Sequence, residues 1–413
     1  MILTLSCPAF SQLSNSRELS LEGYNLPQSY YYLNSVGELY DFQNEWKTIL
    51  DFNWEFTEGL SLITNTVINL NTSAKSRRFI NIRDAFIKYQ SKSLDLRLGR
   101  QLIDWSELSG WSPIDMPNTM YYYDFLNSDD EEIGRWAFNG FLYQDQIVFN
   151  FTLLPFFRSS ELYFNNNRWI RPPETLPLNG MPVSANFSGT NDQIFKNEWQ
   201  FGASINLPIG NVQNSLIYYN GLNDIPVRTL DVTSGNSSEL NYQIGLVYHR
   251  LEQISYQNSF FLGQWNLWSE LNYTRTRISN NDDIIPHKFY NLTAGLDRQF
   301  DLKNESELHL LLQYIYAFNN DNVEYANNDL DHIFNNAIVG KIDFTVNYNL
   351  AILLRFAGDF KTSGYYLNPE IQYNIGQALT LRLRSDFLFG DSMGFFGNYS
   401  DNTRVGLAVQ HYF

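Results

Sequence analysis

Asn402-Thr403-Arg404-Val405-Gly406-Leu407-Ala408-Val409-Gln410-His411-Tyr412-Phe413 closes the chain and decides its fold. Two sets of residues alternate through this stretch with a period of two. Val405, Leu407, Val409, His411 and Phe413 fall on one side, and Arg404, Gly406, Ala408, Gln410 and Tyr412 on the other. Because successive side chains of a β-strand point to opposite faces, the pattern predicts a strand with one largely apolar face.

The stretch resembles the closing strand of a bacterial outer-membrane β-barrel, in which a terminal Phe after alternating apolar positions is read by the barrel-assembly machinery. The resemblance implies that Phe413 is an assembly signal. An ordinary terminal strand of a soluble β-sandwich is the alternative. The barrel is favoured because the same alternation recurs along the whole chain.

Length and composition agree with one large barrel. The chain has 413 residues, more than a typical soluble domain. It contains no apolar run of about 18 residues, which excludes helical membrane spans. Mean hydropathy is only -0.32, yet 16% of the residues are aromatic. A barrel predicts both values, since half of each strand faces lipid, half faces a wet lumen, and aromatic girdles mark the two interfaces.

The formal charge of -16 argues against a nucleic-acid partner, whose binders carry a basic footprint. Residues 1–11 are predicted to be the remnant of a secretory signal, with cleavage after Ala9-Phe10-Ser11 and before Gln12. The one cysteine, Cys7, would be lost with it, and a closed barrel needs no disulfide. A lipoprotein signal at Cys7 is the alternative. A single outer-membrane barrel is then expected over residues 12–413.

The alternation divides the chain into strands. Short links are expected near residues 58, 92, 145, 209, 261, 302, 347 and 377, and mostly longer links alternate with them. Residues 222–238 are expected to form one of the long loops, and residues 240–260 to hold at least one strand, in their later part. The prediction is an all-β, transmembrane, antiparallel up-and-down β-barrel of about 18 strands, with 16 as the other count. Closure follows because lipid offers no hydrogen bonds to an open sheet edge.

Residues 82–118 contain the most informative segment. Ile82-Arg83-Asp84-Ala85-Phe86 is followed by Gly99-Arg100-Gln101 and, after Leu102-Ile103-Asp104, by Trp105; Ser112-Pro113-Ile114-Asp115-Met116-Pro117-Asn118 comes next. This segment resembles outer-membrane barrels of the porin and alginate-export type. Those barrels carry an Arg-acid-Ala-aromatic strand, a Gly-Arg-Gln before an aromatic residue, and a loop with Asp, Asn and Pro. Ser106-Glu107 replaces their Gly-Glu, and the Asn-Pro order is reversed.

If lipid takes the apolar side of every strand, a set of charged side chains projects inward. We predict as pore-lining Arg83, Arg97, Arg100, Asp104, Lys341, Asp343, Arg355, Asp359, Glu370, Arg382, Arg384, Asp386 and Arg404. Opposed rows of arginine and carboxylate would create a transverse field that screens solutes by charge. The same rows could instead brace the wall as a structural ladder between strands. Both interpretations stay open at the level of sequence.

Two long segments, near 102–133 and 155–196, are expected to be outer loops or to fold inward and narrow the pore. Trp105, Trp111 and Asp115 are the predicted constriction residues of the first segment. Its Asp129-Asp130-Glu131-Glu132 run favours a solvated outer loop over a divalent-cation site shared with lipopolysaccharide.

These patterns predict an outer-membrane channel of Gram-negative bacteria for passive transport of small or medium polar solutes, such as acidic organic molecules or saccharides. The alternative is a plugged barrel that serves as an export conduit or a sheath for a polymer, lipid or protein partner. Neither needs a cofactor. The five histidines show no metal-ligand spacing and no catalytic motif is present, so no enzyme is predicted, although a barrel hydrolase using His309 is a third hypothesis. Expected partners are outer-membrane lipid, lipopolysaccharide, the assembly machinery and the polar solute.

Overall fold

Eighteen strands join edge to edge in one sheet, every neighbouring pair antiparallel. The computed structural model describes residues 18–73, 77–106, 108–114, 118–126, 131–164, 167–170, 172, 174–188, 195–235, 239–277, 288–303, 305–319, 334–392 and 394–413. The predicted signal segment 1–11 lies outside these residues. The barrel strands are β1 (Glu18–Tyr32), β2 (Phe42–Thr57), β3 (Leu60–Asn71), β4 (Phe79–Gln90), β5 (Leu94–Gln101), β8 (Arg135–Gln144), β9 (Ile147–Leu154), β15 (Gln200–Ile209), β16 (Val212–Leu222), β19 (Arg250–Leu262), β20 (Trp265–Arg277), β21 (Lys288–Asp301), β22 (Glu307–Asn319), β23 (Asn336–Asn347), β24 (Leu350–Asp359), β25 (Gly364–Ile375), β26 (Leu379–Phe389) and β27 (Arg404–Tyr412).

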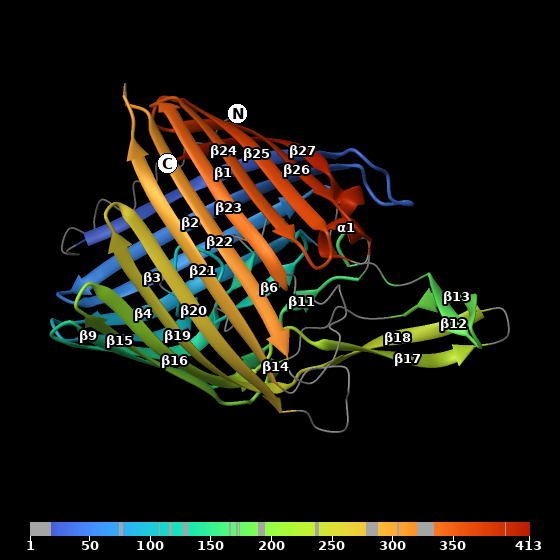
Figure 1. The fold of residues 1–413 in the computed structure, drawn as a ribbon, viewed down its shortest axis with the longest axis horizontal. Coiled ribbons are helices and arrows are strands. Elements are labelled where there is room, and N and C mark those ends of the chain that lie inside the picture. The colour runs from blue at the N-terminus through green and yellow to red at the C-terminus, as the bar shows by residue number, and fades with distance from the viewer. Residues whose placement is uncertain are drawn as a thin grey trace.

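The barrel closes where its first and last strands meet (Figure 1). β1 pairs with β27 from Tyr24 opposite Tyr412 to Tyr32 opposite Arg404. Beyond the last residue of β27, Gly23 and Phe413 exchange two backbone hydrogen bonds of 3.2 and 3.1 Å. Closure removes the free sheet edge and pairs the backbone amides that lipid could not satisfy. The predicted barrel of 18 antiparallel strands is confirmed.

Most barrel strands have a mainly apolar outer face and a mainly polar inner face, as the period-2 pattern predicts. Outward leucine and isoleucine side chains are open to the surroundings of the barrel; Ile80 is 68% and Leu98 62% exposed. Inward polar side chains such as Thr293 and Gln313 are fully covered. Since the outer side chains cannot bury themselves in this protein, the fold is stable only where a hydrocarbon solvent takes the place of a core.

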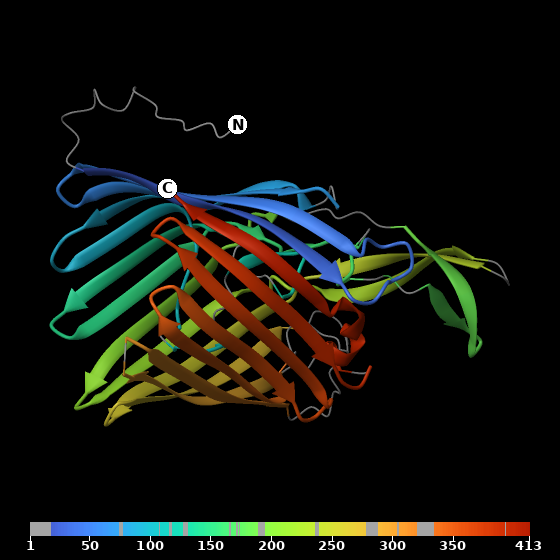
Figure 2. The same ribbon diagram turned by 90° about the horizontal axis from the view of Figure 1, so that it is seen from above.

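Short and long connections lie at opposite ends of the barrel (Figure 2). The short ones follow β2, β4, β8, β15, β19, β21, β23 and β25, and they match the predicted positions to within a few residues. Both ends of the described chain lie on the same side as these turns, since Glu18 pairs with Glu55 and Tyr412 with Tyr24. None of the helices among the described residues is long and apolar enough to cross a membrane.

A small sheet extends beyond the long-link end of the barrel (Figures 1 and 2). It consists of β12 (Thr175–Leu178), β13 (Met181–Phe187), β18 (Glu239–Val247) and β17 (Val227–Gly235). The expected loop at 222–238 is therefore wrong over β17, whereas 240–260, expected to hold at least one strand, contains most of β18 and of β19 (Arg250–Leu262). β13 and β18 pair in parallel, Ser184 opposite Glu239, so the strands depend on a contact between distant segments that no local pattern reveals.

Short elements complete the structure at and inside the same end of the barrel. They are β6 (Thr119–Tyr122), β7 (Glu132–Ile133), β10 (Phe157–Arg158), β11 (Glu161–Leu162), β14 (Phe195–Lys196), the helix α1 (Phe395–Asn398) and the 3₁₀ turn η5 (Ser400–Asn402). The segment 155–196 thus contributes to two different parts of the structure. Leu162 and Trp169 are buried against Leu388 of β26 and Phe395 of α1, whereas β12 and β13 belong to the small sheet.

Candidate functional site

The segment between β5 and β8, called the insert here (residues 102–134), enters the barrel along one wall. Ile103 and Trp105 are buried in an apolar cluster with Tyr219 of β16 and Leu251 of β19. The rings of Trp105 and Tyr219 meet edge to face with centroids 5.2 Å apart. These apolar side chains stand on inner faces that would otherwise be wet, so their burial fixes the start of the insert to the wall.

The insert then reaches the next wall by hydrogen bonds. The Trp111 N–H donates to Gln313 Oε1 of β22 at 2.9 Å, and Gln313 Nε2 donates to the Trp111 carbonyl at 2.7 Å. Ser112 Oγ donates to Glu270 Oε2 of β20 at 2.6 Å. One side-chain amide thus satisfies both backbone groups of Trp111, which places that residue inside the lumen.

Releasing this anchor should widen the passage. Gln313→Ala removes both hydrogen bonds to Trp111, a local loss of about 1–3 kcal/mol in anchoring free energy. We expect a higher single-channel conductance and a noisier open level, because residues 109–111 would no longer be held at the wall. His309→Ala, an inward residue of the same strand, is the matched control. Equal conductance in the two variants would show that Gln313 does not hold the insert.

A buried ionic cluster holds the far end of the insert. Arg404 Nη1 of β27 donates to Asp124 Oδ2 at 2.5 Å, and its Nε donates to Asp386 Oδ2 of β26 at 2.7 Å. Arg77 lies 3.5 Å from Glu45, 3.8 Å from Asp124 and 3.3 Å from Glu131. Burial alone would raise the pKa of Asp124, but the guanidinium groups of Arg404 and Arg77 hold it below its ordinary value.

Glu131 belongs to this cluster and has the opposite shift. Burial, together with the nearby carboxylates of Asp124 and Glu45, raises the pKa of Glu131 from 4.5 to about 8, against the opposing effect of Arg77. Neutral Glu131 leaves three cations, Lys47, Arg77 and Arg404, facing three carboxylates, those of Glu45, Asp124 and Asp386. The cluster is therefore balanced in charge while Glu131 keeps its proton.

Stability should fall as the pH rises through this range. Between pH 4.5 and about 8, Glu131 holds a proton in the folded protein but not in the unfolded one, so each step upward in pH favours unfolding. We expect the denaturant midpoint of the wild type to decrease from pH 5 to pH 8. Glu131→Gln, which stays neutral, should show a smaller decrease. Identical pH profiles of the two proteins would contradict this assignment.

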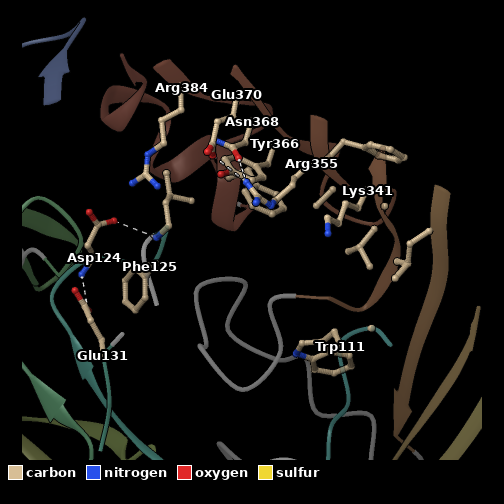
Figure 3. Close-up of a pocket in the computed structure, with 18 of the residues that line it drawn as sticks. Trp111, Asp124, Phe125, Glu131, Lys341, Arg355, Tyr366, Asn368, Glu370 and Arg384 are labelled. Carbon is tan, nitrogen blue, oxygen red and sulfur yellow. Dashed lines mark hydrogen bonds and ion pairs between the residues drawn. The ribbon is translucent and has the colours of Figure 1, made fainter. Parts of the chain in front are cut away.

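Between the insert and the wall formed by β22 to β27 and β1 lies a cavity of about 810 Å³. Lys341 of β23, Arg355 of β24 and Arg382 and Arg384 of β26 line it on the wall side. Figure 3 shows Arg384, Arg355 and Lys341 along that wall, with Trp111 across the cavity and Asp124 and Glu131 to one side. We call Lys341, Arg355, Arg382 and Arg384 the basic row.

Carboxylates and amides of the same wall fix the basic row. Glu370 of β25, only 3% exposed, lies 3.3 Å from Arg355 and 3.9 Å from Arg382. Asn368 accepts a hydrogen bond of 2.9 Å from Arg355, and Lys341 is paired with Asp343. The guanidinium of Arg384 lies 4.7 Å from the centre of the Tyr30 ring. Lys341 and Arg355 nevertheless remain 38% and 43% exposed, so their charge is available to a solute.

Aromatic side chains line much of the rest of the cavity. Trp111 and Phe125 come from the insert, Phe334 from the segment before β23, and Phe395 and Phe396 from α1. Phe396 stacks on Tyr366 of β25 with centroids 5.9 Å apart. One side of the cavity therefore offers positive charge and another offers apolar ring faces. This combination suits a solute with a flat or ring-shaped body and a negative group.

The predicted pore-lining residues Arg83, Arg97 and Arg100 are held by contacts with their neighbours. Arg83 pairs with Glu132 at 3.0 Å, and Arg97 pairs with Asp95 at 3.0 Å. Arg100 donates to the Gly134 carbonyl at 3.0 Å and to Asn81 at 3.2 Å. Asp104, at the start of the insert, is exposed. None of these four lines the cavity described above.

Three further predicted residues point inward but are covered by other parts of the protein. Arg404 and Asp386 belong to the buried ionic cluster. Asp359, 1% exposed, accepts hydrogen bonds from the backbone N–H groups of Asn335, Lys361 and Thr362 and so braces the ends of β23 and β24. These three charges are neutralised by neighbouring groups. Of the predicted pore-lining residues, the cavity is lined only by Lys341, Arg355, Glu370, Arg382 and Arg384.

The predicted constriction residues are divided in the same way. Trp105 is buried against the wall, whereas Trp111 lines the cavity. Asp115 lies outside the described residues. Phe413, the predicted assembly signal, is 51% exposed beside the β1–β27 seam.

Sequence patterns missed Gln313, Asp124 and Glu131. Gln313 is an ordinary inward polar residue in its strand. Glu131 stands in the acidic run interpreted as a solvated loop, and that interpretation is wrong for this residue, which is 1% exposed. Asp124 directly follows the Tyr121-Tyr122-Tyr123 run, and its spacing gives no sign of a buried carboxylate. Within the ranges that the structure describes, no group of three or more His, Cys, Asp or Glu is arranged to hold a metal ion.

Comparison with known proteins supports the fold. No family model and no curated protein matches the sequence. Among solved structures, Pseudomonas aeruginosa OccK2 (OpdF), also solved in complex with glucuronate, has a TM-score of 0.53 at 12% identity over 96% of this chain and 97% of that chain. Pseudomonas aeruginosa OccK11 (OpdR) has a TM-score of 0.50 at 11% identity over 96% and 95%. The fold is a porin-type β-barrel, and at such identities the likeness concerns the fold alone.

Proposed function

We propose that this protein is a passive channel of the bacterial outer membrane for small or medium polar solutes that carry a negative charge. The observation that supports it best is the basic row beside the 810 Å³ cavity in a barrel whose outer face is apolar. Solutes move through such a lumen by diffusion, so the transport requires no cofactor and no catalysis.

An organic acid or an acidic saccharide is the proposed cargo. Arg355 and Arg382, held by Glu370 from the wall, present guanidinium groups that bind a carboxylate in a bidentate manner. The solved complex of OccK2 contains glucuronate, a ring with one carboxylate, in a barrel of similar fold.

The membrane environment follows from the same barrel. Outer-membrane lipid and lipopolysaccharide would surround the apolar outer face, and Phe413 would be recognised by the barrel-assembly machinery. The chain would reach that membrane after removal of residues 1–11, which leaves one barrel over residues 12–413. In this arrangement the short links face the periplasm and the small sheet faces the exterior.

Planar-bilayer recording tests the proposal. The purified, folded protein should form discrete channels with a preference for anions at neutral pH, and glucuronate should permeate or reduce the chloride current. Folding is checked independently by the altered mobility of an unheated barrel in gel electrophoresis. A folded protein that conducts no ions would refute the channel.

One observation favours the second candidate, a plugged barrel that acts as a conduit or sheath for a partner. The insert is anchored to the barrel wall at several places, through Trp105, Trp111 and Asp124. In that case the wild type would be silent in the bilayer, and a stoichiometric protein or polymer would copurify with it. The Gln313→Ala protein, in which the insert is released from the wall, would then conduct ions although the wild type does not.

A further inference from the structure

The outer face of β1 and β2 differs from the rest of the lipid-facing surface. Elsewhere the outward positions are mainly leucine, isoleucine and aromatic residues. Between the outward row of Tyr31 and Phe42 and the outward row of Leu21 and Phe52, these two strands instead present a group that we call the polar patch: Asn25, Ser29, Asn44, Trp46 and Thr48. Their inward neighbours along the strands are buried, which confirms that the patch points outward.

The polar patch lies at the middle of the barrel wall. Asn25 is the central residue of the 15-residue β1, and Thr48 is directly opposite it on β2. The apolar rows above and below place this pair within the hydrocarbon layer and away from the headgroups. A hydrocarbon cannot accept or donate hydrogen bonds, so amide groups that face it cost free energy.

The patch satisfies its own groups only in part. Ser29 Oγ donates to Asn44 Oδ1 at 2.6 Å, and Thr48 Oγ1 donates to Asn25 Oδ1 at 2.8 Å. The Trp46 indole N–H is 3.5 Å from Asn25 Oδ1. Among the residues that the structure describes, neither Asn25 nor Asn44 has an acceptor for its side-chain NH₂ group. Two outward carboxamides are thus left with donors that lipid cannot satisfy.

The adjoining seam of the barrel has a related gap. Gly23 and Phe413 exchange two backbone hydrogen bonds, and in an antiparallel ladder such pairs recur at every second residue. This spacing makes Pro27 and Val409 a hydrogen-bonded position, but proline has no N–H. β1 and β27 indeed have no pairing at Leu26 and Pro27. The Val409 carbonyl therefore has no N–H donor from β1 at Pro27, which lies two residues from Asn25 in the sequence.

We propose that the polar patch is the surface through which two copies of this chain associate within the membrane. The inference rests on the outer-membrane placement in the proposed function. The occupant must itself be embedded in the bilayer, because the patch lies in the hydrocarbon layer. A second copy fits, since each asparagine, serine and threonine offers both donors and acceptors, so the patch complements itself. Trp46, 50% exposed and directly opposite Pro27, supplies a large aromatic ring for the contact.

The test replaces polar groups by side chains that lipid prefers. Asn25→Leu with Thr48→Leu should lower the oligomer fraction in native mass spectrometry or nanodiscs about tenfold or more, while the barrel stays folded. Asn258→Leu with Ser269→Leu is the matched control. That pair also faces outward and is hydrogen-bonded at 2.9 Å, but it lies on β19 and β20 close to their short link, where headgroups and water reach it. The control should keep the wild-type oligomer.

Trp46→Ala is the independent second variant and should weaken the oligomer without touching a strand hydrogen bond. A wild type that is monomeric in the bilayer would overturn the proposal, as would oligomers that survive both patch variants. Conductance separates this inference from the proposed function. Monomeric patch variants should still form anion-preferring channels, because the cavity lies within one barrel; a silent but oligomeric wild type would refute the channel and leave the interface standing.

Discussion

Replacing Arg404 by methionine should destabilise the folded barrel by about 3–5 kcal/mol, the usual cost of removing one partner from a buried ion pair. Arg404 is fully buried and is the partner of both Asp124 and Asp386. Without it, two carboxylates stay in a region from which water is excluded. Since Asp124 belongs to the insert and Arg404 to the closing strand, the loss should also loosen the insert and lower the yield of assembled barrel.

Unfolding in guanidinium, followed by electrophoretic mobility and tryptophan fluorescence, measures this loss. Arg382→Met is the control, because Arg382 lies on the neighbouring strand, is 29% exposed and makes only a long ion pair of 3.9 Å. It should cost less than 1 kcal/mol, as partly exposed pairs do. Adding Asp124→Asn and Asp386→Asn to Arg404→Met should recover much of the stability. If Arg404→Met is as stable as the control, the buried cluster does not hold the barrel together.

Neutralising the basic row should reverse the ion preference of the channel. In a wet lumen, a unit charge about 7 Å from the path of an ion contributes about 0.6 kcal/mol, so removing two positive charges lowers the partitioning of an anion into the lumen about eightfold and raises that of a cation about eightfold. Arg355→Gln with Arg382→Gln should therefore shift the reversal potential in a salt gradient toward cation selectivity. Glu370, left without these two partners, then adds its own attraction for cations.

Glu370→Gln provides the variant of opposite sign at the same place. It removes a negative charge without changing the shape of the side chain and should increase the preference for anions. Both shifts should shrink at high ionic strength, because salt screens charges in an open lumen. A reversal potential that is the same in the wild type and both variants would show that the row does not select ions, whatever the conductance.

Most of the barrel could be predicted because its pattern is local. The short links predicted near residues 92 and 145 match the turns between β4 and β5 and between β8 and β9, and Lys341, Arg355 and Arg382, assigned to the inner face, line the cavity. A strand between lipid and water repeats the same choice at every second residue, so a few residues suffice to decide which face is which.

The small sheet and the anchors of the insert could not be predicted in this way. β17 and β18 depend on the parallel contact of β18 with β13. The alternation of apolar and polar residues in β17 and β18 is too weak to predict a strand. Gln313 and Trp111 meet across 202 residues of sequence, and Arg404 and Asp124 across 280. Such contacts leave no trace in the composition or spacing of either partner.

The amino-acid sequence by itself determined the closed barrel, the orientation of each strand and the set of charges that point inward, because hydrocarbon on one side and water on the other impose a period that every strand must follow. Only the tertiary structure decided which of those charges remain available to a solute. Arg404, Asp386 and Asp359 are occupied by groups that the insert and the strand ends bring to them, whereas Lys341, Arg355 and Arg382 still face the cavity. Burial and pairing depend on where distant segments come to rest, and a period of two carries no information about that.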